Sequence, residues 1–237
     1  MTREARLDLG RRRRLGMVEA VWGEHKTARQ IAAVIQQMDA AGELALVTRV
    51  DDAKAAAVRE ARPGLPVHHH PEARCLCWPD PPPANASLGT VAVLSGGTSD
   101  RVVAEEARLA LLCHGVVAEL VLDVGVAGLH RLLDRLEDLE RASVLIACAG
   151  MEGALPTVLA GLVPQPVIGV PVSVGYGVSA GGRAALHGML ASCAPGVTVV
   201  NIDNGYGAAM AALRILQGPT WGGSRGADAG ASISNSV

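Results

Sequence analysis

Residues 143–172 read SVLIACAGMEGALPTVLAGLVPQPVIGVPV, and this stretch decides the fold. It contains an almost unbroken aliphatic run, a Gly-Met-Glu-Gly turn, a short helical pattern and a second aliphatic run. Aliphatic runs without alternating polar residues are typical of strands that are buried on both faces of a parallel sheet. A strand, a crossover helix and a second strand therefore form one unit of an α/β sheet here.

The same unit repeats on both sides of this stretch. Strands are predicted over residues 90–95, 117–123, 143–149, 166–172 and 197–202. Helices are predicted between and after them, over residues 100–114, 128–140, 153–162, 180–192 and 206–216. Five such units predict an α/β fold with a three-layer parallel sheet, covered by helices on both faces. We assign this domain to residues 89–217.

The first 80 residues have a different pattern, which predicts a smaller α+β region. An amphipathic helix is predicted over 27–41, strands over 44–50 and 74–78, and a second helix over 53–62. Pro81-Pro82-Pro83 cannot belong to a helix or a central strand, so a linker is predicted at 81–88. The Gly-rich tail at 218–237 is expected to be disordered.

Composition and charge argue against several classes of function. Of the 237 residues, 49% are hydrophobic and 19% charged, so the chain can bury a large core. A net charge of -2 gives no general attraction to nucleic acid or to acidic membranes. We expect no signal peptide and no membrane span. The five cysteines have no disulfide spacing, which indicates a reducing, cytoplasmic setting.

Two basic clusters have structural interpretations. The run Arg11-Arg12-Arg13-Arg14 is expected to form a solvated helix face, because the chain as a whole is slightly acidic. The run His68-His69-His70 is expected in an exposed turn before Pro71, because adjacent histidines cannot all face one metal ion. We therefore expect no metal site.

Polar and glycine-rich segments follow the predicted strands. Ligands of α/β sheets bind beyond the carboxyl ends of the strands, so these segments define the candidate site. Ser99 and Asp100 suit either a phosphate site at a helix start or a helix cap. Glu152 suits either an acid–base role or a cap of the following helix. The candidate substrate- or phosphate-binding residues are Gly97, Thr98, Ser99, Asp100, Asp123, His130, Arg131, Gly150, Met151, Gly153, Ser173, Gly175, Tyr176, Gly177, Asn201, Asp203 and Asn204.

Cys193 lies between the predicted helix 180–192 and the last predicted strand. A lone cysteine is normally a small buried hydrophobe. A thiol that shares a pocket with a carboxylate has a second interpretation, as a nucleophile beside a base. We expect Cys193 and Glu152 to converge on one pocket, with Cys193 reaching it by helix geometry or from a neighbouring subunit.

Taken together, the segments at the strand ends resemble the aminoimidazole ribonucleotide carboxylase family. The resemblance rests on Gly97-Thr98-Ser99-Asp100, His130-Arg131, Ala149-Gly150 with Ala154-Leu155-Pro156, and Pro166-Val167-Ile168-Gly169-Val170-Pro171. It implies a flavodoxin-like sheet, a homo-octamer and the transfer of a carboxylate on a nucleotide.

Other segments depart from the purine enzymes of that family: Met151-Glu152-Gly153, Cys193 and Asn201-Ile202-Asp203-Asn204-Gly205-Tyr206-Gly207. Together with the N-terminal region, they resemble the branch that begins synthesis of the nickel-pincer nucleotide, the cofactor of lactate racemase. Members of that branch carboxylate the pyridinium ring of nicotinic acid adenine dinucleotide with bicarbonate or CO2 and release AMP. The resemblance implies that Cys193 is the covalent nucleophile and Glu152 the proton-transfer group. It implies no tightly bound cofactor and leaves open whether Mg2+ assists the phosphoanhydride cleavage.

Two other functions stay open at this point. One is an aminoimidazole ribonucleotide carboxylase or mutase of purine synthesis, whose electron-rich substrate needs no thiol. The other is a nucleotide-binding protein without catalytic activity, because fold alone does not establish function. Cys193 argues for the pyridinium substrate, since an electron-poor ring must first accept a nucleophile before it can attack CO2.

Overall fold

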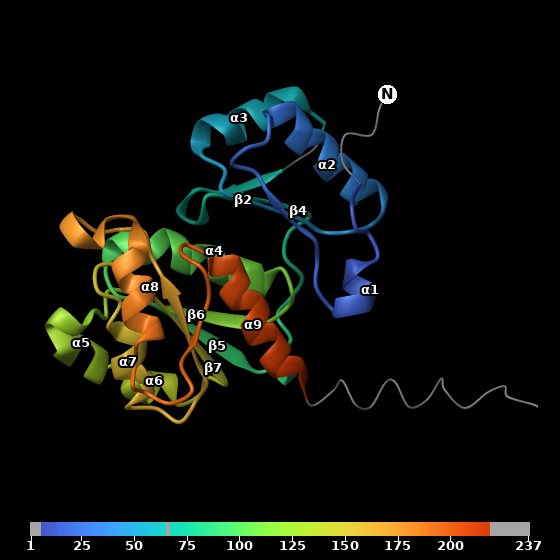
Figure 1. Ribbon diagram of the computed structural model, residues 1–237. Helices are drawn as coiled ribbons and strands as arrows, with labels where there is room; N and C mark the ends of the chain where they lie inside the picture. Colours follow the sequence, from blue (N-terminus) through green and yellow to red (C-terminus); the bar gives the residue numbers. More distant parts are fainter. Residues whose placement is uncertain (1–5, 65–66, 219–237) are drawn as a thin grey trace, which may run out of the picture.

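The computed structural model describes residues 6–64 and 67–218, which form two sheets (Figure 1). The larger sheet contains β5 (Thr90–Ser95), β6 (Val117–Val121), β7 (Val144–Ala149), β8 (Val167–Pro171) and β9 (Thr198–Val199). Its strand order is β6-β5-β7-β8-β9, and all neighbouring strands are parallel. This order is that of flavodoxin-like sheets and confirms the predicted α/β class.

Helices cover both faces of the larger sheet (Figure 1). On one face lie α4 (Arg101–Leu112) and α9 (Gly205–Gln217), whose Leu109 and Leu213 share a core with Val93 of the sheet. On the other face lie α5 (Leu129–Leu133), α6 (Leu136–Leu139), α7 (Leu155–Ala160) and α8 (Arg183–Leu190). These four helices bury Leu132, Leu139, Leu159 and Met189 in a second core. The sheet is therefore apolar on both faces, as its aliphatic strands require.

The N-terminal region has a smaller mixed sheet in the order β1-β2-β4-β3. Its strands are β1 (Ala20–Trp22), β2 (Ala45–Thr48), β3 (His68–His70) and β4 (Cys75–Trp78), and its helices are α1 (Arg11–Leu15), α2 (Ala28–Ala40) and α3 (Asp52–Ala61). A capping box of Thr27 and Gln30 starts α2. The apolar face of α2, with Ile31 and Ile35, then packs on the sheet.

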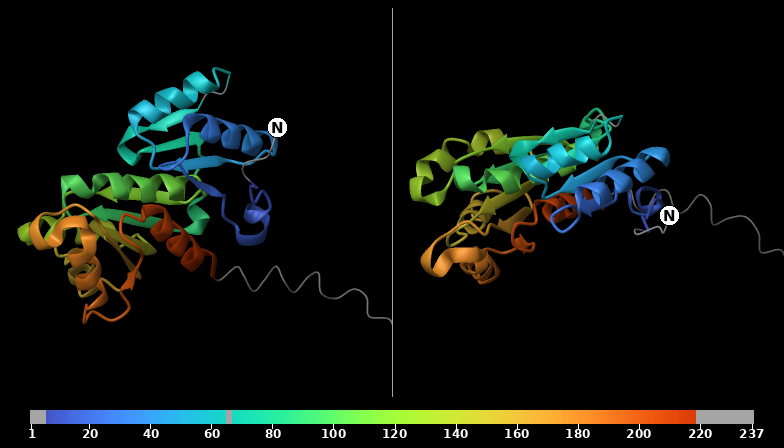
Figure 2. Two further views of the ribbon diagram at one scale, coloured as in Figure 1. Left: turned by 45° about the horizontal axis from the view of Figure 1, so that its top comes forward. Right: turned by 90° about the horizontal axis from the view of Figure 1, so that it is seen from above.

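The N-terminal sheet packs on the face that α4 and α9 form (Figure 2). Leu46 and Cys77 of this sheet belong to the same core as Leu213 of α9. A hydrogen bond of 3.0 Å from the Val18 amide to His114 Nε2 also joins the two parts of the chain. The layer of α4 and α9 is thus covered on both sides, by the larger sheet and by the N-terminal sheet.

Three sequence predictions differ from the structure. The predicted exposed turn at His68–His70 is wrong, because these residues form β3, pair with β4 and are partly buried. The predicted helix 128–140 is two short helices, α5 and α6, separated at Asp134 and Arg135. The last predicted strand pairs only at Thr198–Val199. For the helix and for the last strand, a continuous apolar pattern in the sequence does not reveal where the regular secondary structure stops.

The predictions for the arginine run, for membrane-spanning helices and for the tail have the following outcomes. Arg12, Arg13 and Arg14 are exposed on α1, which confirms the solvated helix face. In the part of the chain that the structure describes, none of the helices combines the length and apolar character needed to cross a membrane. The prediction of a disordered tail concerns residues that, from 219 onward, lie outside the described ranges.

Candidate active site

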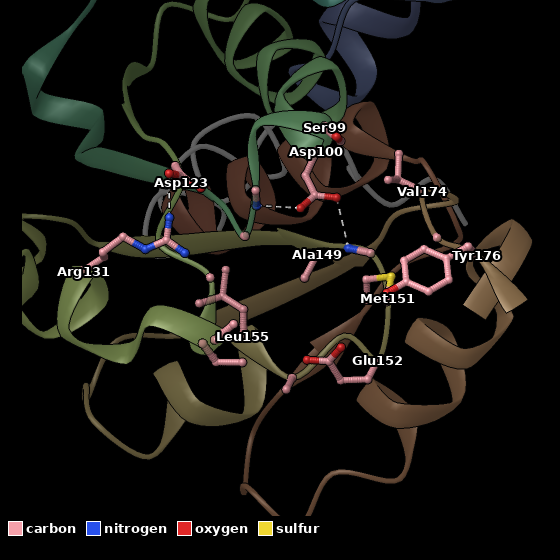
Figure 3. Close-up of a pocket in the computed structure, with 18 residues that line it drawn as sticks. Ser99, Asp100, Asp123, Arg131, Ala149, Met151, Glu152, Leu155, Val174 and Tyr176 are labelled. Carbon is pink, nitrogen blue, oxygen red and sulfur yellow. Dashed lines mark hydrogen bonds and ion pairs between the residues drawn. The ribbon is translucent and has the colours of Figure 1, made fainter. Parts of the chain in front are cut away.

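A cavity of about 520 Å3 lies at the carboxyl edge of the larger sheet (Figure 3). It is lined by the segments that follow β5, β6, β7 and β8, as expected for ligand sites of open α/β sheets. Its volume falls in the usual range for small-molecule sites, roughly 300–1,000 Å3. The cavity is therefore large enough for a substantial part of a nucleotide.

Asp100 holds two of the lining segments together (Figure 3). Its carboxylate is buried and accepts a hydrogen bond of 2.8 Å from the Gly97 amide and one of 3.1 Å from the Gly150 amide. Burial raises the pKa of Asp100 above its usual value, while these two backbone bonds act in the opposite direction. Asp100 thus ties the turn after β5 to the turn after β7.

The turn after β7 also crosses the segment after β8 at very close range. A Cβ atom on Gly150 would lie 2.3 Å from the Val174 carbonyl oxygen, so only glycine fits here. The next residue, Met151, donates its amide to the same oxygen at 3.0 Å and has a φ of 53°. This crossing aims the following residue, Glu152, at the cavity wall.

A cation and a carboxylate face each other across the cavity. Arg131 on α5 forms an ion pair of 2.6 Å with Asp123 and keeps further donor positions on its guanidinium. Figure 3 shows Glu152 on a different wall, below Asp100 and between Leu155 and Tyr176. Glu152 is exposed, so its carboxylate is open to a ligand. The cavity therefore offers a site for an anionic group and a separate proton acceptor.

The structure brings many of the predicted site residues into this cavity. They are Gly97, Ser99, Asp100, Asp123, Arg131, Gly150, Met151, Glu152, Gly175 and Tyr176. Sequence reasoning missed the apolar part of the lining, for which no polar motif gives a signal: Val126, Ala127, Ala154, Leu155 and Val174.

Other predicted residues line neither this cavity nor the one described next: Thr98, His130, Gly153, Gly177, Asn201 and Asn204. His130 is exposed on α5. Asn204 caps α9 by accepting a hydrogen bond of 2.8 Å from the Gly207 amide. For Asn204 the structure therefore supplies a helix-capping role.

A second cavity, of about 220 Å3, adjoins the first between the larger sheet and the N-terminal region. Ser99 and Val174 line both cavities. The predicted residues Ser173 and Asp203 line only the second one, where Ser173 donates its amide to Asp203 Oδ1 at 2.7 Å. Sequence reasoning missed three charged residues of its lining: Arg49, Arg74 and Glu106. Two features of the sequence could have indicated them: Arg49 directly follows an apolar strand, and Glu106 lies on an apolar face of a helix.

Cys193 lies in the loop between α8 and β9. It lines neither cavity. Its neighbours Pro195 and Gly196 instead border a different cavity, of about 290 Å3, with Pro164 and Pro166 at the amino edge of β8. Within one chain, Cys193 therefore does not share a cavity with Glu152, because a loop from a helix into a parallel strand lies at the opposite edge of the sheet from the site. The route from a neighbouring subunit stays a prediction.

The five thiols differ in accessibility. Cys75, Cys77, Cys113 and Cys148 are buried, whereas Cys193 is exposed. Desolvation raises the pKa of Cys75 and Cys148, and the hydrogen bond with Cys77, followed by desolvation, raises that of Cys113. A raised pKa keeps a thiol protonated and unreactive. Cys193 is therefore the thiol that a ligand can reach from solvent.

Metal ligation receives no support from the arrangement of side chains. Among residues 6–64 and 67–218, no three His, Cys, Asp or Glu side chains are grouped so that they could share a metal ion. The polar groups of the two cavities instead suit an organic anion with hydroxyl groups.

Comparison with known proteins adds to this geometry. Residues 90–220 match the family model described as AIR carboxylase, and residues 1–80 match one described as LarB/PurE-like N-terminal domain. An uncharacterised protein of Methanocaldococcus jannaschii is 38% identical over 208 residues, which cover 86% of this chain and 80% of that relative. N5-carboxyaminoimidazole ribonucleotide mutases of Methanocaldococcus jannaschii and Pyrococcus abyssi are 37% and 34% identical, each over 53% of this chain and over 78% and 72% of their own lengths.

Proposed function

Because the chain belongs to the AIR carboxylase family and carries a LarB/PurE-like N-terminal domain, we propose that it carboxylates the pyridinium ring of nicotinic acid adenine dinucleotide. Water also cleaves the phosphoanhydride of this substrate, and the products are pyridinium biscarboxylic acid mononucleotide and AMP. This reaction is the first step of nickel-pincer nucleotide synthesis. CO2 or bicarbonate supplies the new carboxylate, and no tightly bound cofactor is needed.

The chemistry requires a nucleophile and a base. The Cys193 thiolate adds to a ring carbon, and the electron pair moves to the ring nitrogen to give a neutral dihydropyridine. The enamine carbon of this ring then attacks CO2 and forms the new C–C bond. Glu152 takes the proton from the same carbon, and expulsion of the thiolate restores the aromatic pyridinium. Arg131 offers its cation to a carboxylate of the ring or to bicarbonate.

The exposure of Cys193 is the observation that supports this proposal most. It is the exposed cysteine in a chain whose other four are buried. A purely structural cysteine is normally buried, so an exposed one in this position calls for another role. A mutase acting on an electron-rich aminoimidazole would have no use for it.

Cys193 lines neither cavity of its own chain, so the proposed chemistry requires two copies to build one site. We propose a homo-octamer in which the α8–β9 loop of one subunit reaches the cavity of its neighbour. Large apolar side chains beside the cavity and on α8 support such contacts, since Tyr176 is 78%, Val178 95% and Leu190 64% exposed.

An assay with three substrates tests the proposal. Purified protein is incubated with nicotinic acid adenine dinucleotide, and AMP release is measured with and without bicarbonate. The proposal predicts AMP release together with a carboxylated mononucleotide, and a dependence on bicarbonate. If the protein leaves the dinucleotide unchanged in this assay, the proposal is refuted.

A purine-pathway reaction is the second candidate, because two of the relatives are N5-carboxyaminoimidazole ribonucleotide mutases. The same protein is therefore also assayed with N5-carboxyaminoimidazole ribonucleotide and with aminoimidazole ribonucleotide plus bicarbonate. Turnover of either one, without turnover of the dinucleotide, would establish the purine reaction instead. Binding of nucleotide without any turnover would establish a non-catalytic role.

A further inference from the structure

The second cavity brings two arginines of the N-terminal region to the edge of the carboxylase-like domain. Arg49 directly follows β2, and Arg74 directly precedes β4. The amide of Val50 donates to the carbonyl of Arg74 at 2.7 Å, so the two arginine backbones are held side by side. Both residues have a positive φ, 57° for Arg49 and 50° for Arg74, which is uncommon for a residue with a side chain.

The guanidinium groups of Arg49 and Arg74 differ in the hydrogen bonds and ion pairs that they form. Arg49 donates to the Asp203 carbonyl at 2.6 Å and lies 4.0 Å from the Glu24 carboxylate. Arg74 is exposed, and within the described residues its guanidinium forms neither a hydrogen bond nor an ion pair. Arg74 is therefore a cation at the cavity wall that keeps all its donors for a ligand.

The acidic groups of this cavity are occupied by backbone amides. Glu106 is buried and accepts a hydrogen bond of 2.9 Å from the Tyr206 amide at the start of α9. One carboxylate oxygen of Asp203 accepts from the Ser173 amide at 2.7 Å. These bonds hold both carboxylates in place, and they leave the other oxygen of Asp203 as an acceptor for a hydroxyl group.

The remaining lining is apolar, with Ala73, Val102, Val103 and Val172. An apolar wall, a free guanidinium and a carboxylate acceptor suit the groups of a nucleotide. The cavity of about 220 Å3 is smaller than the usual range of roughly 300–1,000 Å3, so part of such a ligand extends beyond it. Because Ser99 and Val174 line both cavities, the two cavities adjoin at these residues.

We propose that the cavity between the N-terminal region and the carboxylase-like domain binds the AMP half of the dinucleotide, with Arg74 as the phosphate ligand. The identity of this ligand rests on the proposed function, whereas the cavity and its charges do not. The pyridinium half then occupies the larger cavity, and the phosphoanhydride lies near Ser99 where the two cavities meet. The N-terminal region is thus part of the substrate site.

Calorimetric titration of the full-length protein with AMP tests this proposal. Arg74→Ala should weaken AMP binding at least about tenfold, the effect expected for loss of a charge-assisted hydrogen bond. The matched control is Arg29→Ala, which removes an exposed arginine of the same region outside both cavities and should leave the affinity unchanged. Adenosine, which lacks the phosphate, should bind the wild type and Arg74→Ala equally.

The proposal is overturned if wild-type protein does not bind AMP, or if Arg74→Ala binds AMP like the wild type. Equal melting temperatures of the variants exclude a folding defect as the cause of weaker binding. Dinucleotide turnover, measured separately, keeps the two proposals apart. A protein that carboxylates the dinucleotide but binds AMP independently of Arg74 refutes only the subsite. A protein that binds AMP through Arg74 without turnover refutes only the proposed reaction.

Discussion

Two carboxylates of the larger cavity have opposite environments, and this difference assigns their roles. Asp100 is buried and uses both oxygens to bind the Gly97 and Gly150 amides. Glu152 is exposed and open to a ligand. A carboxylate whose oxygens are occupied positions the backbone, whereas an open one can accept a proton from substrate. We therefore propose a positioning role for Asp100 and proton transfer for Glu152.

Glu152→Gln should lower the carboxylation rate by more than about a hundredfold, the lower range for the loss of an acid–base group. Glutamine keeps the size and hydrogen-bonding capacity of the side chain but cannot take a proton. The measurement is single-turnover kinetics, with the rate expressed per folded molecule. An unchanged rate accompanied by lower stability would show that Glu152 has only a structural role.

Asp100 predicts a specific dependence of stability on pH. Burial raises its pKa in the folded state, so the folded protein binds the proton more tightly than the unfolded chain does. The stabilisation from this group is complete below the pKa of the unfolded chain and is lost as the pH rises through the raised pKa. The free energy of unfolding of wild type relative to Asp100→Asn should therefore fall from acidic to neutral pH.

Urea unfolding at several pH values between about 3.5 and 7 measures this difference, starting near the usual aspartate pKa. Comparison with Asp100→Asn cancels the contributions of the other titrating groups. A difference that grows toward neutral pH would mean that the two backbone hydrogen bonds dominate over burial.

At the scale of elements, α8 supports the turn that carries Glu152. A Cβ atom on Gly188 of α8 would lie 2.4 Å from the Glu152 carbonyl oxygen. Helix and turn are therefore packed as closely as a glycine permits. Any widening of this contact moves the turn that carries Glu152 relative to the cavity.

Gly188→Ala should therefore lower both stability and turnover, although alanine favours a helix by about 1 kcal/mol over glycine. Gly161→Ala is the matched control, because a Cβ atom there meets its nearest neighbour at 3.4 Å, an ordinary contact. Thermal unfolding and steady-state kinetics of both variants check this prediction. A Gly188→Ala protein that is more stable than the wild type and equally active would contradict the packing argument.

The sequence predicts the elements of the larger sheet because its strands are aliphatic runs that only a doubly covered sheet can bury. It does not predict β3, because three histidines give neither an apolar run nor an alternating pattern. Glycine and polar residues after strands predict the cavity, since the carboxyl ends of parallel strands share one edge. Cys193 follows a helix rather than a strand, so the same rule places it at the other edge.

At the scale of the whole molecule, the position of Cys193 outside the cavity of its own chain predicts that the protein acts as an oligomer. The site as proposed is incomplete within one chain, and a second copy must supply the thiol. Such an arrangement makes activity depend on association, so light scattering should detect an oligomer, with eight subunits expected from the family resemblance. A fully active monomer would contradict it.

Mixing two inactive variants tests the shared site directly. Cys193→Ala and Glu152→Gln, co-expressed with different affinity tags, should form mixed oligomers in which some sites combine a native Glu152 with a native Cys193. These mixed oligomers should regain carboxylation activity, while each variant alone stays inactive. If both residues acted within one chain, none of the mixed sites would be intact and activity would not return.

The covalent role of Cys193 is the central claim, and mass spectrometry tests it most directly. Wild-type protein and Cys193→Ala are incubated with nicotinic acid adenine dinucleotide in the absence of bicarbonate, quenched with acid and measured intact. The wild type should gain the mass of the bound dinucleotide, peptide mapping should place the adduct on Cys193, and Cys193→Ala should show no adduct. Both proteins are also assayed with bicarbonate present, and carboxylation by Cys193→Ala at the wild-type rate would contradict the covalent mechanism.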